Sequence, residues 1–209
     1  MSAALRAGGT PDIARLRRAV HPLDTPPCPP TAADRLVPDD PAAPRSAAAV
    51  LVPLVRRADG LTLLLTRRTD TLRTHAGQVS FPGGRIEDDD DGAVGAALRE
   101  TQEETGIAPA FVQPLGYLDA FDTVSGYCVS PVVGLVEPDF ALAPDPAEVS
   151  AVFEVPFAYI LTPGRMQTTR VQWRGAQRRI HEFDYAGHRV WGATAAIILN
   201  LIQRLEAVQ

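Results

Sequence analysis

The sequence predicts an α/β protein in which a mixed β-sheet is covered by helices on both faces, an α/β/α sandwich. Two observations favour this class. Short apolar or alternating segments, typical of strands, are interleaved with two substantial helical segments. The chain has 209 residues, of which 45% are hydrophobic, and this is enough to bury the core of one domain.

The first 45 residues are predicted to be an extension that precedes the main domain. Residues 1–9 are expected to be disordered, and Ile13–Val20 can form a short basic helix. The proline-rich run Pro22–Pro44 is typical of an extended connector with little core of its own. The main domain is therefore expected to span residues 46–209.

The main domain is expected to begin with a β-hairpin. Ala48–Arg56 and Leu61–Arg67 are predicted strands, and residues 58–60 form the turn between them. Alternation around Val79 indicates another, half-buried strand. The later predicted elements are the strands Val112–Tyr117 and Val129–Val136, a hairpin of Thr169–Trp173 with Ile180–Tyr185, and a closing helix from Trp191 to Leu205.

Three glutamates at helical spacing carry the strongest chemical signal. Glu100, Glu103 and Glu104 lie three and four positions apart, so their side chains share one side of a helix. Uncompensated carboxylates repel one another, whereas a hard cation such as Mg²⁺ or Mn²⁺ binds oxygen ligands and removes that conflict. The backbone carbonyl of Gly84 could complete the ligand set. The alternative interpretation is a solvated acidic helix face.

The helix that carries these glutamates is predicted to run from Ala93 to Thr105. Asp90 or Asp91 could cap its start, and Gly106 is a suitable end. Arg99, at the edge of the carboxylate face, suits a structural ion pair as well as a phosphate contact. The predicted buried stripe consists of Val94, Ala97, Leu98 and Thr101, with Ala93 and Ala96 expected beside the carboxylates.

This region resembles the signature of the Nudix hydrolases, known as the Nudix box. Two departures stand out: Thr101 replaces the usual aliphatic residue, and the loop after Gly84 is one residue longer than in the common box. The resemblance implies an α/β/α Nudix fold and metal-dependent hydrolysis of a diphosphate. The positions that match are Arg99, Glu100, Glu103, Glu104, Gly106 and Ile107.

The segment just upstream, Leu64–Gly84, is similar to the signature of the coenzyme A pyrophosphatase subgroup of this family. Every fixed position matches except Thr69, which replaces serine by another hydroxyl residue. The longer box is also typical of that subgroup. The resemblance implies that coenzyme A is cleaved to 4′-phosphopantetheine and adenosine 3′,5′-bisphosphate.

Four basic residues within that segment are the predicted substrate-binding residues: Arg67, Arg68, Arg73 and His75. Guanidinium groups bind phosphate through paired, charge-assisted hydrogen bonds. Two alternatives remain open. The arginines can form structural ion pairs in an ordinary solvated loop, and His75 can be a structural imidazole that bonds the loop backbone.

A later glutamate is a further candidate. Glu148 begins a segment, Glu148–Pro156, that resembles another conserved pattern of the same subgroup, and the resemblance implies a role as additional metal ligand or base. An ordinary exposed carboxylate is the alternative. Glu103 and Glu148 are the predicted catalytic residues, while the choice of general base among coupled carboxylates stays open.

Composition limits the partners. The net charge of −5 and a pI near 5.4 argue against nucleic-acid binding and leave a small phosphorylated substrate as the expected partner. Cys28 and Cys128 are far apart, which favours a reducing compartment. Without a secretory signal or a membrane span, the expected location is the cytoplasm. The sequence indicates no oligomeric state.

Two rival functions remain. The first is a Nudix pyrophosphatase that acts on another nucleoside diphosphate derivative, such as ADP-ribose or a dinucleotide. The second is a metal-free nucleotide sensor on the same fold. A sensor needs no set of three glutamates at metal-binding spacing, so the sequence favours the hydrolase. The expected cofactor is Mg²⁺ or Mn²⁺, with no preference between them.

Overall fold

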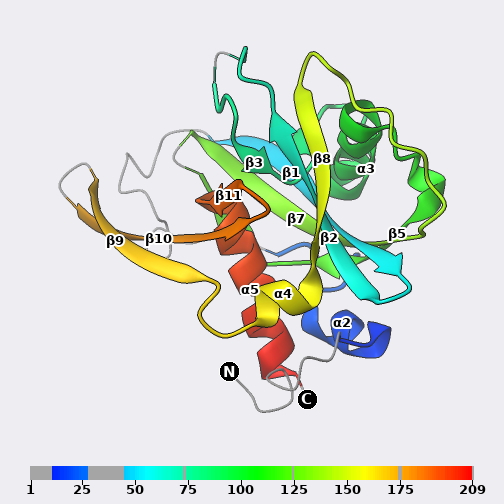
Figure 1. Ribbon diagram of the computed structural model, residues 1–209. Coiled ribbons are helices and arrows are strands. Elements are labelled where there is room, and N and C mark those ends of the chain that lie inside the picture. Colours follow the sequence, from blue (N-terminus) through cyan, green and yellow to red (C-terminus); the bar gives the residue numbers. More distant parts are fainter. Residues whose placement is uncertain (1–10, 28–44, 73, 124, 174–175, 209) are drawn as a thin grey trace.

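A mixed β-sheet forms the centre of the molecule (Figure 1). The computed structural model describes residues 11–27, 45–72, 74–123, 125–173 and 176–208. The predictions for residues 1–9, for the connector beyond residue 27 and for Arg73 lie outside these ranges. The strands of this sheet are β1 (Ser46–Arg57), β2 (Gly60–Arg68), β3 (Val79–Ser80), β4 (Gly83–Arg85), β5 (Val112–Tyr117), β6 (Phe121–Asp122), β7 (Tyr127–Val136) and β8 (Val149–Pro156).

The sheet is mixed because β1 runs parallel to β7, whereas the other pairs are antiparallel. The order β3-β2-β1-β7-β5 forms its main path, and β8 pairs with the outer edge of β2. The predicted hairpin is confirmed, with Arg57 opposite Gly60 at its turn. The far end of β2 instead lies between β3 and β8, where Arg67 pairs with both Val79 and Ala151.

Helices cover both faces of this sheet (Figure 1). On β1, Leu51 and Val55 pack on the side of α3, whereas Val52 and Leu54 pack on the side of α5. Burial on both faces explains why β1 is almost continuously apolar. The predicted α/β/α sandwich is therefore confirmed. The helices are α2 (Ile13–Ala19), α3 (Gly92–Thr105), α4 (Phe157–Leu161) and α5 (Ala193–Ala207), with a 3₁₀ turn at Pro109–Phe111.

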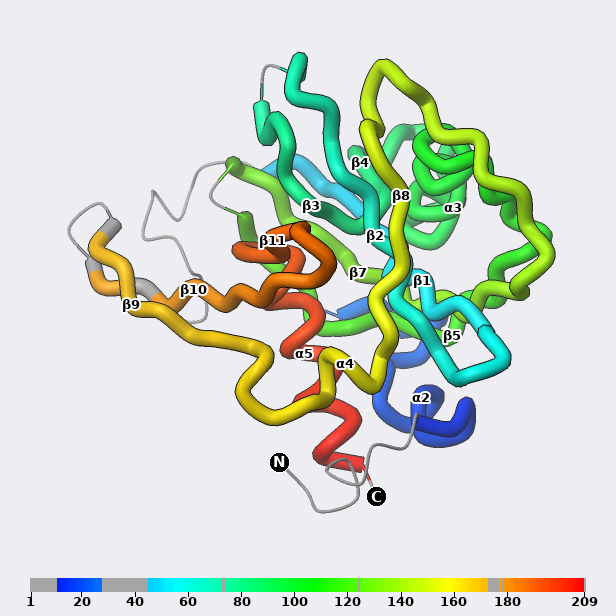
Figure 2. The backbone as a smooth tube through the Cα atoms, in the orientation of Figure 1, coloured from blue at the N-terminus to red at the C-terminus, as the bar shows by residue number. Residues whose placement is uncertain are grey.

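The predicted N-terminal helix is present as α2 and lies against α5 (Figure 2). Leu16 is fully buried in the same hydrophobic cluster as α5. Asp119 joins the two regions, since its carboxylate accepts hydrogen bonds from Arg204 at 2.7 Å and Asn200 at 2.6 Å and contacts the His21 ring at 2.7 Å. The α2 segment thus shares a core with residues beyond 46. None of the helices in the described ranges has the length and apolar character of a membrane span.

A second, three-stranded sheet follows β8. The predicted late hairpin is confirmed as β9 (Gln167–Trp173) and β10 (Ala176–Tyr185). The C-terminal end of β10 pairs in turn with β11 (His188–Trp191). Because β11 has only four residues, its alternation is too short to stand out in the sequence. This strand leads directly into α5.

The capping and the buried face of α3 differ from the sequence predictions. Asp91 occupies the N-cap position but its side chain forms no capping hydrogen bond, and Asp90 binds Arg99 instead. Ala96, expected beside the carboxylates, is fully buried. The reason is that the face of α3 that carries the carboxylates overlaps the face that packs on the sheet. Glu104 lies two helical turns after the buried Ala97, on that same packed face, and is itself only 4% exposed. The predicted residues Val94 and Leu98 are only partly buried.

Candidate functional site

Five carboxylates converge on one depression of about 220 Å³. Three of them, Glu100, Glu103 and Glu104, come from α3 and are the three predicted from helical spacing. The loop before β8 supplies Asp145 and Glu148. The structure therefore brings the predicted Glu148 to the glutamate cluster, together with Asp145, which the sequence reasoning missed.

Capping of α3 brings the loop to this place. The last carbonyls of a helix have no partner within the helix. Here the backbone N–H of Ala143 donates to the Thr105 carbonyl at 2.9 Å, and that of Asp145 donates to the Glu104 carbonyl at 3.2 Å. Figure 2 shows this segment running from β7 past the end of α3 to β8. No motif in the sequence signals Asp145, because its position depends on this long-range contact.

Glu104 is the most perturbed carboxyl group of the site. It is 4% exposed, and its Oε2 atom is buried without a hydrogen-bond partner. The Arg68 guanidinium is its nearest counter-charge, at 3.9 Å. Loss of hydration raises the pKa of Glu104 to about 8; Arg68 opposes this rise, and the charges of Glu100 and Glu148 add to it.

Arg99 holds much of the acidic surface in place. A guanidinium has five N–H donors, and Arg99 forms five hydrogen bonds. Two go to the Asp90 carboxylate at 2.9 and 3.0 Å, one each to Glu100 at 3.0 Å and Glu103 at 3.2 Å, and one to the Arg85 carbonyl. Of the two roles considered for Arg99, the structure shows the structural ion pair.

Close contacts surround the glycine pair before the acidic loop. A Cβ atom at Gly83, where φ is +153°, would collide with the backbone of Val50 on β1. One at Gly84 would overlap the carboxylate of Glu100. The backbone of Gly84 thus lies directly against Glu100, a predicted metal ligand, and the role of the Gly84 carbonyl as a further ligand stays a prediction.

The predicted basic cluster is divided between the two faces of the sheet. Arg68 faces the carboxylate depression, 3.9 Å from Glu104 and 3.7 Å from Glu148. Arg67 lies on the opposite side and binds Asp70 at 3.0 Å. Consecutive residues of a strand point to opposite faces, and these two do so although the pairing of β2 with β8 shifts its register between them. Because β2 extends to Arg68, the two arginines cannot act on the same phosphate from one surface.

Side-chain contacts within the loop and to a neighbouring segment hold the loop between β2 and β3 in place. The Thr69 hydroxyl donates to the Ala147 carbonyl at 3.2 Å, which ties the loop to the segment that carries Asp145 and Glu148. This contact explains why a hydroxyl residue suits that position. The exposed His75 has a left-handed φ of 58°, and its Nδ1 contacts Gln78 at 2.8 Å. Its ring thus contacts a side chain of the same loop and not the loop backbone, and its role in substrate binding stays a prediction.

The donors of the depression suit a hard divalent cation. All of them are carboxylate oxygens, the ligands that Mg²⁺ and Mn²⁺ prefer. The partnerless Oε2 of Glu104 is an observation that a bound cation would explain. In the described part of the chain, no three His, Cys, Asp or Glu side chains are already spaced as a closed metal centre. Arg99 instead holds Glu100 and Glu103 in ion pairs.

Comparison with known proteins agrees with this geometry. The model of the NUDIX domain matches residues 45–174. A Nudix hydrolase named NudL from Escherichia coli K12, described as uncharacterized, is 48% identical over 154 residues, which cover 74% of this chain and 80% of that protein. NudL from Cronobacter sakazakii is equally similar, with the same identity and coverage.

Solved structures show the same fold. A MutT/nudix family protein from Enterococcus faecalis aligns with a TM-score of 0.50 and 18% identity, covering 81% of this chain and 64% of that one. The family match extends over more than half of the chain and includes both α3 and Glu148. On these grounds, the chain belongs to the Nudix hydrolase family.

Proposed function

We propose that this Nudix hydrolase cleaves the diphosphate linkage of coenzyme A or one of its derivatives, with Mg²⁺ or Mn²⁺ as cofactor. Nudix hydrolases act on nucleoside diphosphate derivatives, and coenzyme A is one of these. The observation that carries the proposal is the convergence of Glu100, Glu104 and Glu148 beside Arg68. The coenzyme A signature in β2 and the following loop supports the choice of substrate.

Glu100, Glu104 and Glu103 would hold the cation, with the Gly84 carbonyl as a further ligand. When bound, the cation would polarise the phosphate oxygens and lower the pKa of the attacking water. Glu104 contributes a carboxylate whose charge is stabilised in the fold by Arg68 at 3.9 Å and by a backbone hydrogen bond from Gly83. Arg99 keeps Glu100 and Glu103 oriented toward the same surface.

Glu103 and Glu148 are the candidates for the general base that accepts a proton from the attacking water. The side chains of Glu103 and Glu148 are 60% and 48% exposed, so both remain open to water at the rim of the depression. A general base needs hydrogen-bond reach of the proton that it accepts. We prefer Glu148 because it lies on the opposite side of the depression from α3, 3.7 Å from the Arg68 guanidinium.

The overall reaction adds one water molecule across the P–O–P bridge. The hydroxyl part forms a new bond to one phosphorus while the bridging oxygen leaves with the other, and the products are 4′-phosphopantetheine and adenosine 3′,5′-bisphosphate. Arg68, beside the carboxylates, is the guanidinium best placed to contact a diphosphate oxygen. The role of Arg67 in substrate binding must then be different.

A product analysis tests the proposal. Coenzyme A, dephospho-coenzyme A and ADP-ribose are incubated separately with the enzyme and either Mg²⁺ or Mn²⁺, and products are identified by mass spectrometry. Coenzyme A is expected to have the highest kcat/KM and to give the two products above. Faster turnover of ADP-ribose would overturn the coenzyme A assignment, and failure with every substrate would overturn the hydrolase mechanism.

A further inference from the structure

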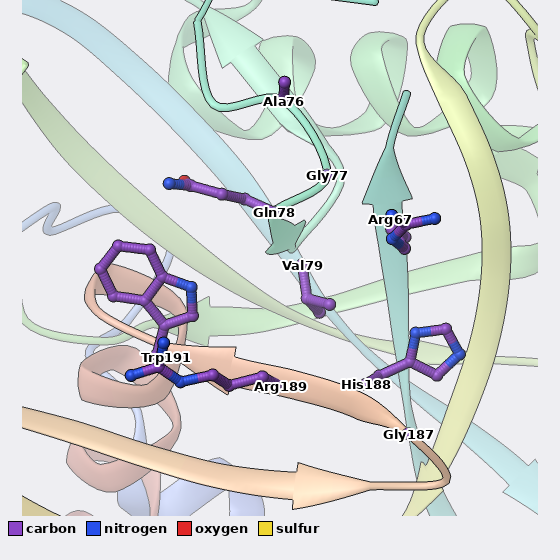
Figure 3. A pocket seen from close by; sticks show the side chains of 9 residues that line it. All are labelled: Arg67, Ala76, Gly77, Gln78, Val79, Gly187, His188, Arg189 and Trp191. Carbon is purple, nitrogen blue, oxygen red and sulfur yellow. The ribbon is translucent and has the colours of Figure 1, made fainter. Parts of the chain in front are cut away.

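A second pocket, of about 330 Å³, lies on the face of the sheet opposite the carboxylate depression (Figure 3). One wall is the end of β2 and the loop leading to β3, with Arg67, Gly77 and Gln78. The other wall is the turn between β10 and β11 and the β11 strand itself, whose lining residues are Gly187, His188, Arg189 and Trp191. This second wall lies beyond residues 45–174, the part matched by the NUDIX model.

We propose that this pocket binds a nucleoside phosphate, with a planar base against the aromatic wall and a phosphate near Arg67. Its volume is within the range of about 300 to 1,000 Å³ that is typical of small-molecule sites. Both chemical features of such a ligand have a counterpart in the wall. The proposal gives a role to Arg67, which the carboxylate site does not use.

The aromatic counterpart is held rigidly. The His188 ring stacks on Phe153 with the centroids 4.1 Å apart and the planes 10° from parallel. The Arg189 guanidinium lies 5.4 Å from the centre of the Trp191 ring. A nucleic-acid base stacks favourably on an aromatic or guanidinium plane, whatever the identity of the base. Figure 3 shows the Trp191 and His188 rings on the two sides of the pocket.

The phosphate counterpart consists of two guanidinium groups, each of which already has a carboxylate partner. Arg67 binds Asp70 at 3.0 Å, and the Asp70 side chain is 73% exposed. Arg189 binds Glu182 at 2.7 Å through its Nε, while its own side chain is 60% exposed. Ion pairs between side chains that remain in contact with water stabilise a protein only weakly. A phosphate with two negative charges can therefore replace Asp70 as the partner of Arg67.

The backbone near Arg67 leaves room for the Arg67–Asp70 pair at the wall of the pocket. Gly77 has φ of +68°, and a Cβ atom there would lie 2.6 Å from Asp70 Oδ1 and 3.4 Å from an Arg67 nitrogen. Any other residue at this position would push against the Arg67–Asp70 pair. The buried Val79 forms an apolar floor beside them. The sequence signature around Gly77 thus shapes this pocket rather than the carboxylate depression.

Two sources could supply the nucleoside phosphate: the nucleotide end of the proposed substrate, or a free nucleotide. Arg67 and Arg68 are consecutive residues that face the two different pockets. A long, flexible substrate could reach both by passing around the end of β2. That first source rests on the proposed function, whereas the binding of a free nucleotide does not.

The test measures binding without catalysis. The chain has two tryptophans, so in a Trp173→Phe background Trp191 is the sole tryptophan and its fluorescence reports on the pocket. Adenosine 3′,5′-bisphosphate is titrated in EDTA, where no divalent cation can support binding at the carboxylates. Saturable quenching is expected, with affinity about tenfold weaker after Arg67→Gln or Arg189→Gln, because each change removes a charge-assisted contact.

The matched control is Arg170→Gln, which removes the same charge from an exposed position on β9. Its effect should be less than twofold. Inorganic phosphate alone should bind at least tenfold more weakly than the bisphosphate, since it has no base to stack. No saturable quenching, an equal loss in all three variants, or equal binding of inorganic phosphate would each overturn the proposal.

Kinetics with coenzyme A distinguish the two sources. If the pocket holds the nucleotide end of the substrate, the bisphosphate inhibits competitively, and Arg189→Gln weakens this inhibition about tenfold. If it takes a free nucleotide, quenching by the bisphosphate persists in saturating coenzyme A. Nucleotide binding without coenzyme A hydrolysis would contradict only the proposed function. Hydrolysis without nucleotide binding would contradict only this inference.

Discussion

Replacing Glu104 by glutamine separates the cost of the buried carboxylate from its function. The substitution keeps the shape of the side chain and removes its charge. In the metal-free fold, burial raises the pKa of Glu104 to about 8 from an ordinary value of 4.5. Since one pKa unit corresponds to about 1.4 kcal/mol, ionising this group in the fold costs at most about 5 kcal/mol.

The pH dependence of stability follows from the pH at which Glu104 loses its proton in the folded and in the unfolded state. The unfolded chain loses the Glu104 proton near pH 4.5, whereas the folded protein keeps it up to about pH 8. The free energy of unfolding therefore falls progressively as the pH rises between these two values, because Glu104 has a higher pKa in the folded state than in the unfolded chain. Between pH 5.5 and 7.5, the loss from Glu104 is about 2 to 3 kcal/mol.

Urea unfolding in EDTA at these two pH values measures this loss. The difference in unfolding free energy between Glu104→Gln and the unaltered protein is measured at each pH. This difference should shift in favour of the variant by about 2 to 3 kcal/mol between pH 5.5 and pH 7.5. Glu103→Gln, with a 60% exposed side chain on the same helix, is the control for removing one negative charge. An identical pH dependence in the Glu104→Gln and unaltered proteins would refute the reasoning.

Function should change in the opposite direction. Mg²⁺ or Mn²⁺ at 100 times its dissociation constant should stabilise the unaltered protein by about 2.7 kcal/mol, and Glu104→Gln should lose most of this effect. Its turnover of coenzyme A should fall at least about a hundredfold, equivalent to about 2.7 kcal/mol. Normal metal-dependent rates in this variant would show that Glu104 does not hold the cation.

Three further predictions follow from single contacts. Gly84→Ala should displace the Glu100 carboxylate and lower turnover more than about tenfold, while the melting temperature stays nearly constant; unchanged kcat/KM would contradict the contact. Arg99→Lys loses the paired bonds to Asp90 and should cost about 1 to 3 kcal/mol in urea unfolding, and a smaller cost would show that lysine can replace the network. Asp119→Asn tests a carboxyl group whose pKa lies below its ordinary value. Burial alone would raise this pKa, but the hydrogen bonds from His21 and Asn200 and the charge of Arg204 lower it by more. The unaltered protein should be the more stable above pH 5, and its advantage should disappear as the pH falls through and below 3.8; an advantage that persists in acid would refute this.

Local periodicity was enough to locate much of the site. The positions of Glu100, Glu103 and Glu104 on one helix follow from 3.6 residues per turn, and the strands on both sides follow from runs of apolar residues. The separation of Arg67 from Arg68 was also accessible, because consecutive strand residues alternate. It was missed because the predicted strand ended at Arg67, one residue short of its true end.

Contacts between distant segments decided the rest. Asp145 reaches the glutamates because the carbonyls at the end of α3 need hydrogen-bond partners. The pKa of Glu104 is raised only because the folded chain buries its carboxyl group away from water. The pocket at Trp191 likewise exists only where β11 meets the β2–β3 loop. Sequence patterns report the neighbours within a turn or a strand. Desolvation and convergence depend on residues that are distant in the sequence, and only the tertiary structure brings these together.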